Sequence, residues 1–258
     1  MPKFAANLSM LFTEHDFLDR FKAAADAGFK GVEYLFPYDF AANDVADALK
    51  TNGLTQVLHN LPAGDWGAGE RGIACHPDRV SEFREGVDKA IEYARTLGCQ
   101  QLNVLAGKVP EGVAEQQARE TFVENVRFAA DKLEAEGIRL LAEPINTRDI
   151  PGFFLHNTRQ ALEIFDEVGS RNVALQYDIY HMQIMEGDLA PTIEANLERI
   201  AHIQLADNPG RHEPGTGEIN YPFLFRFLDE HGYRGWIGCE YKPANGTEAG
   251  LDWVKPYL

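Results

Sequence analysis

The sequence predicts a single α/β domain in which eight strand–helix units close into a (β/α)8 barrel. Its length of 258 residues suits one barrel of roughly 250 residues. Eight short apolar runs recur along the chain, with helix-like stretches between them. Parallel strands joined by helical crossovers close into a barrel when there are eight of them. The chain has no glycine-rich dinucleotide-binding motif, which would favour a doubly wound sheet instead.

The eight predicted strands are rich in β-branched and other apolar residues. In order they are KFAANL from residue 3, GVEYLF from 31, LTQVLHN from 54, QLNVLAG from 101, RLLAEPI from 139, VALQYDIYH from 173, IAHIQLAD from 200 and WIGCEYK from 236. The unequal intervals between these runs favour a barrel with insertions over a tandem-repeat array.

Helices are predicted where apolar residues recur at intervals of three or four. The segments are 16–28, 78–98, 120–137 and 157–169, and glycine ends several of them at a position suited to a helix C-cap. The chain has no low-complexity stretch, linker or run of five like charges. We therefore expect one barrel domain covering residues 1–258.

The acidic composition limits the expected partners. Asp and Glu number 40 against 24 Lys and Arg, and the resulting net charge of −16 would repel the phosphate backbone of a nucleic acid. No run of uninterrupted apolar residues is long enough to span a bilayer, and the first residues lack the cleavage pattern of a signal peptide. We expect a soluble, cytoplasmic protein whose partners are small molecules or other copies of itself, with no nucleic acid and no membrane.

The three cysteines are expected to be reduced thiols. Cys75, Cys99 and Cys239 are odd in number and lack CxxC spacing, which argues against a disulfide framework or a thiolate zinc site. Alternation along the last strand points Cys239 toward the helix layer, so it is interpreted as a core residue.

In a barrel of this kind the chemistry lies at the C-terminal ends of the strands. Side chains along a strand alternate between the barrel interior and the helix layer. The predicted inward residues on the last four strands are Leu141 and Glu143; Ala174, Gln176 and Asp178; His202 and Gln204; and Gly238 and Glu240. Three carboxylates and one amide are therefore expected to converge on one rim.

The converging oxygen groups predict a metal site formed by Glu143, Asp178, Gln204 and Glu240. Without a cation, three neighbouring carboxylates would repel one another, and at least one would stay protonated. Ligation by oxygen alone favours a hard divalent ion, Mg²⁺ or Mn²⁺, over zinc. The alternative for any one of these residues is a solvated charge or a salt bridge at a loop edge.

Other polar residues are candidates for binding the substrate. Arg211, in the glycine-rich loop after the seventh strand, is suited to a substrate carboxylate, and Arg71, Arg148 and Lys108 compete for that role. His181 either donates to a substrate oxygen or packs against Tyr180. His59, which ends the third strand, is a further candidate, whereas His202 is expected to be a hydrogen-bonded core residue.

The sequence resembles the hydroxypyruvate isomerase family of the xylose-isomerase-like TIM barrels over essentially its full length. The motifs that carry the resemblance are FAANLSMLF (4–12), EYLFPYD (33–39), HNLPAGDWGAGERGIA (59–74), EPIN (143–146), DIPGF (149–153), QYDIYHMQ (176–183), ADNPGRHEPGTGEINY (206–221) and GCEYKP (238–243). The resemblance implies isomerisation of hydroxypyruvate to tartronate semialdehyde, cofactor-free or metal-assisted, with Glu143 and Glu240 as catalytic acid and base. Related sugar epimerases carry His where this chain has Gln204.

The implied reaction moves a proton between neighbouring carbons through an enediolate, and two carboxylates can divide that work. No nicotinamide or flavin motif is present. An isomerase or epimerase of a longer keto acid or ketose, such as 2-oxo-tetronate, is the alternative within this reaction class. A metal-dependent hydrolase such as an apurinic-site endonuclease would need several His ligands and a basic groove. A non-catalytic binding barrel also stays open.

Overall fold

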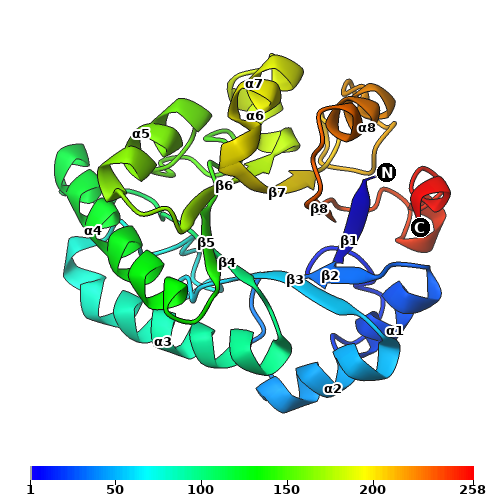
Figure 1. The fold of residues 1–258 in the computed structure, drawn as a ribbon, viewed down its shortest axis with the longest axis horizontal. Coiled ribbons are helices and arrows are strands. Elements are labelled where there is room, and N and C mark those ends of the chain that lie inside the picture. Colours follow the sequence, from blue (N-terminus) through cyan, green and yellow to red (C-terminus); the bar gives the residue numbers. More distant parts are fainter. Residues whose placement is uncertain (1) are drawn as a thin grey trace.

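The computed structural model describes residues 2–258, and it confirms the closed barrel of eight strands (Figure 1). Every strand pairs in parallel with its sequence neighbours, and the last strand pairs back with the first. Each predicted strand is present: β1 (Lys3–Asn7), β2 (Gly31–Glu33), β3 (Thr55–Asn60), β4 (Gln101–Val104), β5 (Arg139–Ala142), β6 (Val173–Asp178), β7 (Ile200–Leu205) and β8 (Trp236–Cys239).

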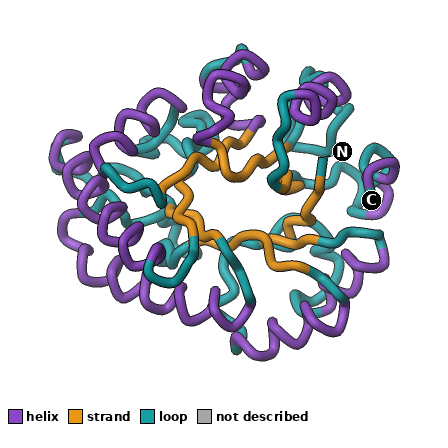
Figure 2. Tube along the Cα trace, in the orientation of Figure 1, coloured by secondary structure: helices purple, strands orange, loops and turns teal. Residues whose placement is uncertain are grey.

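Helices surround the ring of strands, as Figure 2 shows. They are α1 (Asp19–Asp26), α2 (Ala42–Asn52), α3 (Val80–Leu97), α4 (Glu115–Glu134), α5 (Thr158–Val168), α6 (Ile179–Met185), α7 (Leu189–Asn196) and α8 (Tyr221–Glu230), with 3-10 turns at Pro77–Arg79, Leu197–Arg199, Glu248–Gly250 and Lys255–Tyr257. The four predicted helices correspond to α1, α3, α4 and α5. Within residues 2–258, none of the helices combines the length and apolar character needed to cross a membrane.

Four of the helices were not predicted: α2, α6, α7 and α8. Helix α2 buries only Val45 and Leu49, so its apolar stripe is thin, although Gly53 ends it in the left-handed conformation as a C-cap does. Helix α8 is apolar over most of its length, and a continuous apolar run does not show a helical period. Helix α4 also begins at Glu115, before the predicted start at residue 120.

The core has two parts, and they confirm the predicted alternation of side chains. Leu140 and Ala142 belong to the large cluster between the strands and the helices. Leu141, between them, belongs to a small apolar cluster inside the barrel with Ala5, Val57, Leu58 and Ala174. Toward the C-terminal ends of the strands the interior becomes polar, and the candidate site lies there.

The three cysteines are free and buried, as predicted. Cys239 lies in the cluster that faces the helices. Burial raises the pKa of Cys75 and Cys99 to about 12. These thiols therefore act as small core residues rather than as nucleophiles.

Candidate active site

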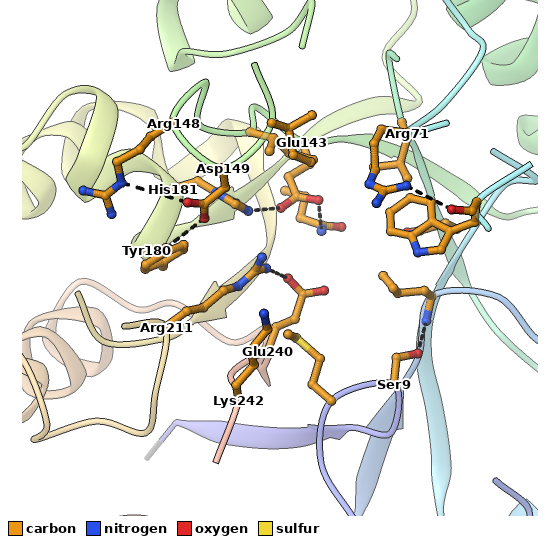
Figure 3. Close-up of a pocket in the computed structure, with 18 of the residues that line it drawn as sticks. Ser9, Arg71, Glu143, Arg148, Asp149, Tyr180, His181, Arg211, Glu240 and Lys242 are labelled. Atoms are coloured by element: carbon orange, nitrogen blue, oxygen red, sulfur yellow. Dashed lines mark hydrogen bonds and ion pairs between the residues drawn. The ribbon is translucent and has the colours of Figure 1, made fainter. Parts of the chain in front are cut away.

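A cavity of about 690 Å³ opens at the C-terminal ends of the strands (Figure 3). Its lining comes from residues that end or follow strands around the whole barrel: Ser9, Leu35, Asn60, Leu105, Glu143, Gln176, Arg211 and Glu240. This is the face where barrel enzymes carry their chemistry.

The three predicted acidic residues meet at the base of this cavity, where Glu143 and Glu240 line it and Asp178 is buried beside them. Glu143, Asp178, His181 and Glu240 each offer one potential ligand atom, and these atoms all lie within 4.8 Å of one another. Their side chains are buried, with residue exposures between 0% for Asp178 and 5% for Glu240. Strands β5, β6 and β8 therefore deliver their carboxylates to one point, as the alternation predicted.

Asp178 divides its two oxygens between the backbone and the cluster. Oδ1 accepts hydrogen bonds from the backbone N–H of Tyr180 (2.7 Å) and of His181 (3.4 Å), and so caps helix α6. Oδ2 lies 3.6 Å from His181 Nε2 and has no hydrogen-bond partner among the described residues. The first turn of α6 thus carries His181 back over the carboxylate.

The ring of His181 is oriented by Asn146. The side-chain amide nitrogen of Asn146 lies 2.6 Å from Nδ1, and its backbone N–H lies 3.4 Å from the same atom. Because both groups can only donate, Nδ1 accepts, and the proton of a neutral ring is assigned to Nε2. Burial lowers the pKa of His181 well below its ordinary value, so the ring is neutral. Nε2 therefore presents a donor to the cluster, which suits a substrate oxygen better than a metal ion.

Burial and mutual repulsion favour protons or a cation on the three carboxylates. Burial, with the charges of Glu240 and Asp178, raises the pKa of Glu143 well above its ordinary value. Burial raises the pKa of Asp178 to about 6 and the pKa of Glu240 to about 7, although nearby Arg211 opposes both shifts. Like Asp178 Oδ2, Glu143 Oε1 is buried without a hydrogen-bond partner in the described chain. Unpaired carboxylate oxygens directed to one point fit a divalent cation.

Arg211 supplies the cation that the sequence analysis expected near the acidic cluster. Its Nη2 donates to Glu240 Oε2 at 2.5 Å, and its guanidinium lies 5.2 Å from the ring centre of Tyr180. The loop that carries it is held by Asp207, whose carboxylate accepts from four backbone N–H groups, those of Asn208, Gly215, Gly217 and Ile219. Arg211 is therefore mounted on an ordered loop at the mouth of the barrel.

Gln204, the fourth predicted metal ligand, lies in the polar layer beneath the cluster. Its amide nitrogen donates to Glu33 Oε1 at 2.7 Å, and its Oε1 accepts from Gln176 at 2.6 Å. It points into the barrel as predicted, and its role as a ligand stays a prediction.

The predicted cations are distributed unevenly around the cavity. Arg71 lines it, and its guanidinium lies 4.2 Å from the ring centre of Trp66. Figure 3 shows Arg71 on the opposite side of the cavity from Arg148 and Arg211. Lys108 is not among the lining residues, whereas Lys242, which the sequence analysis did not select, is one of them.

His59 is not brought to the cavity. It is fully buried beside Tyr34 and Tyr38, and burial lowers its pKa to about 3. Its neighbour Asn60 lines the cavity instead. Alternation along β3 places Asn60 and Leu58 inside the barrel and His59 outside, so the position of His59 does not support the predicted contact with substrate.

Two buried polar residues of the site were missed by the sequence analysis. Asn7 ends β1 and Glu33 ends β2, and they are 1% and 0% exposed. Each is a polar residue inside an otherwise apolar predicted strand, KFAANL or GVEYLF, and that interruption is the signal that would have found both.

Comparison with known proteins gives consistent matches over the chain. The sequence model of the family described as xylose isomerase-like TIM barrel matches residues 21–257. Hydroxypyruvate isomerase of Escherichia coli is 57% identical over 257 residues, which cover 100% of both chains. The 2-oxo-tetronate isomerase of Cupriavidus necator is 52% identical and covers 100% of this chain and 99% of its own. A crystal structure of an AP endonuclease, family 2, from Brucella melitensis has a TM-score of 0.97 at 52% identity, covering 100% of this chain and 99% of that one.

Proposed function

The chain belongs to the xylose isomerase-like TIM barrel family, and we propose that it interconverts hydroxypyruvate and tartronate semialdehyde (2-hydroxy-3-oxopropanoate) by proton transfer between two glutamates. One observation carries the proposal: Glu143 and Glu240, which are 97 positions apart in the sequence, offer carboxylate oxygens within 4.8 Å of each other at the floor of one cavity. A substrate of three carbons can contact both. The protein is thus an isomerase that acts on a small keto acid. We also propose that it takes part in glyoxylate metabolism.

The two glutamates divide the proton transfer. One removes a proton from the hydroxyl-bearing C3 of hydroxypyruvate, the C2–C3 enediolate forms, and the other delivers a proton to C2 while the hydroxyl proton passes from O3 to O2. The raised pKa values of Glu143 and Glu240 suit groups that alternate between acid and base near neutral pH. His181 Nε2–H donates to a substrate oxygen, and Arg211 or Arg71 holds the carboxylate.

A divalent ion, Mg²⁺ or Mn²⁺, would be held by Glu143, Asp178 and Glu240, with Gln204 as the fourth oxygen ligand. When bound, such an ion withdraws electron density from the substrate oxygens and stabilises negative charge that develops on them.

A longer 2-oxo acid is the second candidate substrate. The cavity of about 690 Å³ is much larger than a three-carbon acid requires, and Arg71 lies across it from Arg211. The relative from Cupriavidus necator is named for 2-oxo-tetronate. Hydrolysis of nucleic acid is not favoured, because the acidic cluster contains one histidine and the chain carries a net charge of −16.

The test is NMR observation of hydroxypyruvate in deuterated water, with and without a chelator. We expect wild-type protein to form tartronate semialdehyde and to incorporate deuterium. Glu143→Gln and Glu240→Gln should each lower the rate at least about 100-fold. Glu111→Gln also removes one negative charge, but at an exposed position, and it should leave the rate unchanged. Wild-type protein that neither isomerises hydroxypyruvate nor exchanges its protons would refute the proposal, and the same assay with 2-oxo-tetronate ranks the two substrates by kcat/KM.

A further inference from the structure

Glu33 is a buried carboxylate for which the proposed mechanism has no use. It lies beneath the acidic cluster inside the barrel and is 0% exposed. It accepts three side-chain hydrogen bonds: from Asn7 Nδ2 at 3.0 Å and Gln204 Nε2 at 2.7 Å on Oε1, and from His202 Nε2 at 2.7 Å on Oε2. A carboxylate so completely paired is a fixed acceptor at the centre of this polar layer.

This acceptor determines the direction of the amides around it. Because only the NH₂ end of an amide can face a carboxylate oxygen, the Gln204 nitrogen must point to Glu33, and its oxygen must turn toward Gln176. Gln176 then donates to Gln204 at 2.6 Å and to Glu143 Oε2 at 2.9 Å. The same rule directs both protons of the Asn7 amide to carboxylates, one on Glu33 and the other on Glu240 Oε1 at 3.2 Å.

The result is an unbroken chain of hydrogen bonds that joins the two proposed catalytic glutamates. It runs from Glu240 through Asn7, Glu33, Gln204 and Gln176 to Glu143. This hydrogen-bond chain ends on one oxygen of each glutamate, Oε1 of Glu240 and Oε2 of Glu143. The other oxygens face the cavity: Oε1 of Glu143 has no partner among the described residues, and Oε2 of Glu240 meets Arg211.

Strand β8, which is separated from β2 only by β1, is shaped around Glu33. Gly238 of β8 faces it, and a Cβ at this position would overlap both carboxylate oxygens of Glu33. A glycine in a strand interior weakens the strand, and here it provides the space for a buried acid. Glu33 is therefore built into the barrel rather than accommodated in a spare gap.

We propose that Glu33 is a positioning residue for the isomerisation: it orients the Asn7 and Gln204 amides, and through them it selects which oxygen of Glu240 and of Glu143 faces the substrate. This inference rests on the proposed function of the two glutamates. Catalytic groups must be held close to their productive geometry, and the side chains beneath them usually provide that constraint.

The test is Glu33→Leu, which has a similar volume but removes both acceptor oxygens, so the Asn7 and Gln204 amides lose the group that orients them. We expect kcat for hydroxypyruvate to fall at least about tenfold while KM changes less than about threefold, because the cavity wall is untouched. Gln56→Met is the matched control. Gln56 is a buried glutamine of the barrel whose side-chain amide donates to the backbone carbonyl of Leu58. It is not a member of the hydrogen-bond chain between the glutamates, so this change should leave kcat within about twofold.

A double-mutant cycle separates positioning from a general loss of structure. If Glu33 acts through Asn7, Asn7→Ala should lower kcat in wild type but have little further effect in Glu33→Leu. Additive effects, or an unchanged kcat in Glu33→Leu, would overturn the proposal. Should Glu33→Leu fail to fold, Gln176→Leu interrupts the hydrogen-bond chain next to Glu143 and should lower kcat at least about tenfold. An unchanged kcat in that variant would overturn the proposal equally.

A second readout does not depend on activity. In wild type the side-chain NH₂ signals of Asn7 and Gln204 should exchange slowly with solvent, and in Glu33→Leu this protection should be lost for at least one of them. Unchanged protection of both amides in the variant counts against the inference, even if wild-type protein does not turn over hydroxypyruvate. If wild-type protein does not turn over hydroxypyruvate but the NH₂ groups are protected in wild type and lose that protection in the variant, the proposed function is refuted and the positioning role of Glu33 is not.

Discussion

Adding a divalent metal should stabilise the protein far more at pH 7.5 than at pH 5.5. Burial raises the pKa of Asp178 to about 6 and that of Glu240 to about 7 in the metal-free protein. These carboxyls stabilise the fold in their protonated form, so that contribution is present at low pH and is lost as the pH rises through 6 to 7. The metal requires the deprotonated forms, so protons compete with it at the lower pH.

The size of the effect follows from the two pKa values. Displacing the protons of Asp178 and Glu240 weakens the apparent affinity for the metal about 100-fold at pH 5.5 relative to pH 7.5, and the raised pKa of Glu143 adds to this. The difference in metal-induced stabilisation is therefore at least about 3 kcal/mol at saturating metal. For a domain of this size that corresponds to a difference of about 6 to 12 °C in the metal-induced rise of Tm.

Thermal unfolding of chelator-treated protein, followed with and without Mg²⁺ or Mn²⁺ at both pH values, measures this difference. Asp178→Asn keeps the oxygen that caps α6 but removes the charge, so the metal-induced rise should shrink strongly at pH 7.5. Glu111→Gln should behave as wild type, because that residue is exposed. Equal metal effects at the two pH values, or no metal effect at either, would show that the carboxylates do not form the site.

Three further outcomes are expected. Arg211→Met removes the positive charge that holds down the pKa of Glu240, so the acidic limb of the kcat–pH profile should move to higher pH; a profile that stays in place would contradict this. Asp207→Asn leaves loop N–H groups without an acceptor, so KM for hydroxypyruvate should rise about tenfold and amide exchange in 208–219 should accelerate, while retained protection would argue otherwise. Phe122→Ala empties a fully buried position that packs against Phe154, and denaturant unfolding should show a loss of about 3 to 5 kcal/mol with kcat retained.

Alternation along the strands could be read from the sequence, and it placed most of the site. Glu143, Asp178 and Glu240 each come two residues after a residue predicted to point into the barrel. Their convergence was therefore predictable from the alternation. The same rule, applied to β3, would have selected Asn60 in place of His59. The choice of His59 came from considering residue type before side-chain direction.

Other parts of the site depend on geometry that short-range patterns do not contain. Strand β2 has three residues, and its register with β3 shifts between Val32 and Glu33, so alternation there has almost no length over which to be recognised. The tautomer of His181 is set by Asn146, which lies 35 positions earlier in the chain. The hydrogen-bond chain through Glu33 joins strands from both halves of the sequence, and only the closed barrel brings its members together.

The two-oxygen arrangement of Asp178 has a consequence for engineering this barrel. One oxygen of the side chain caps α6 and the other belongs to the buried acidic cluster, and His181 follows less than one helical turn later. Inserting or deleting a single residue between them would rotate the imidazole by about 100° around the helix axis. Loop grafting after β6 therefore has to begin beyond His181, and the DIYH tetrapeptide has to be transplanted as one unit.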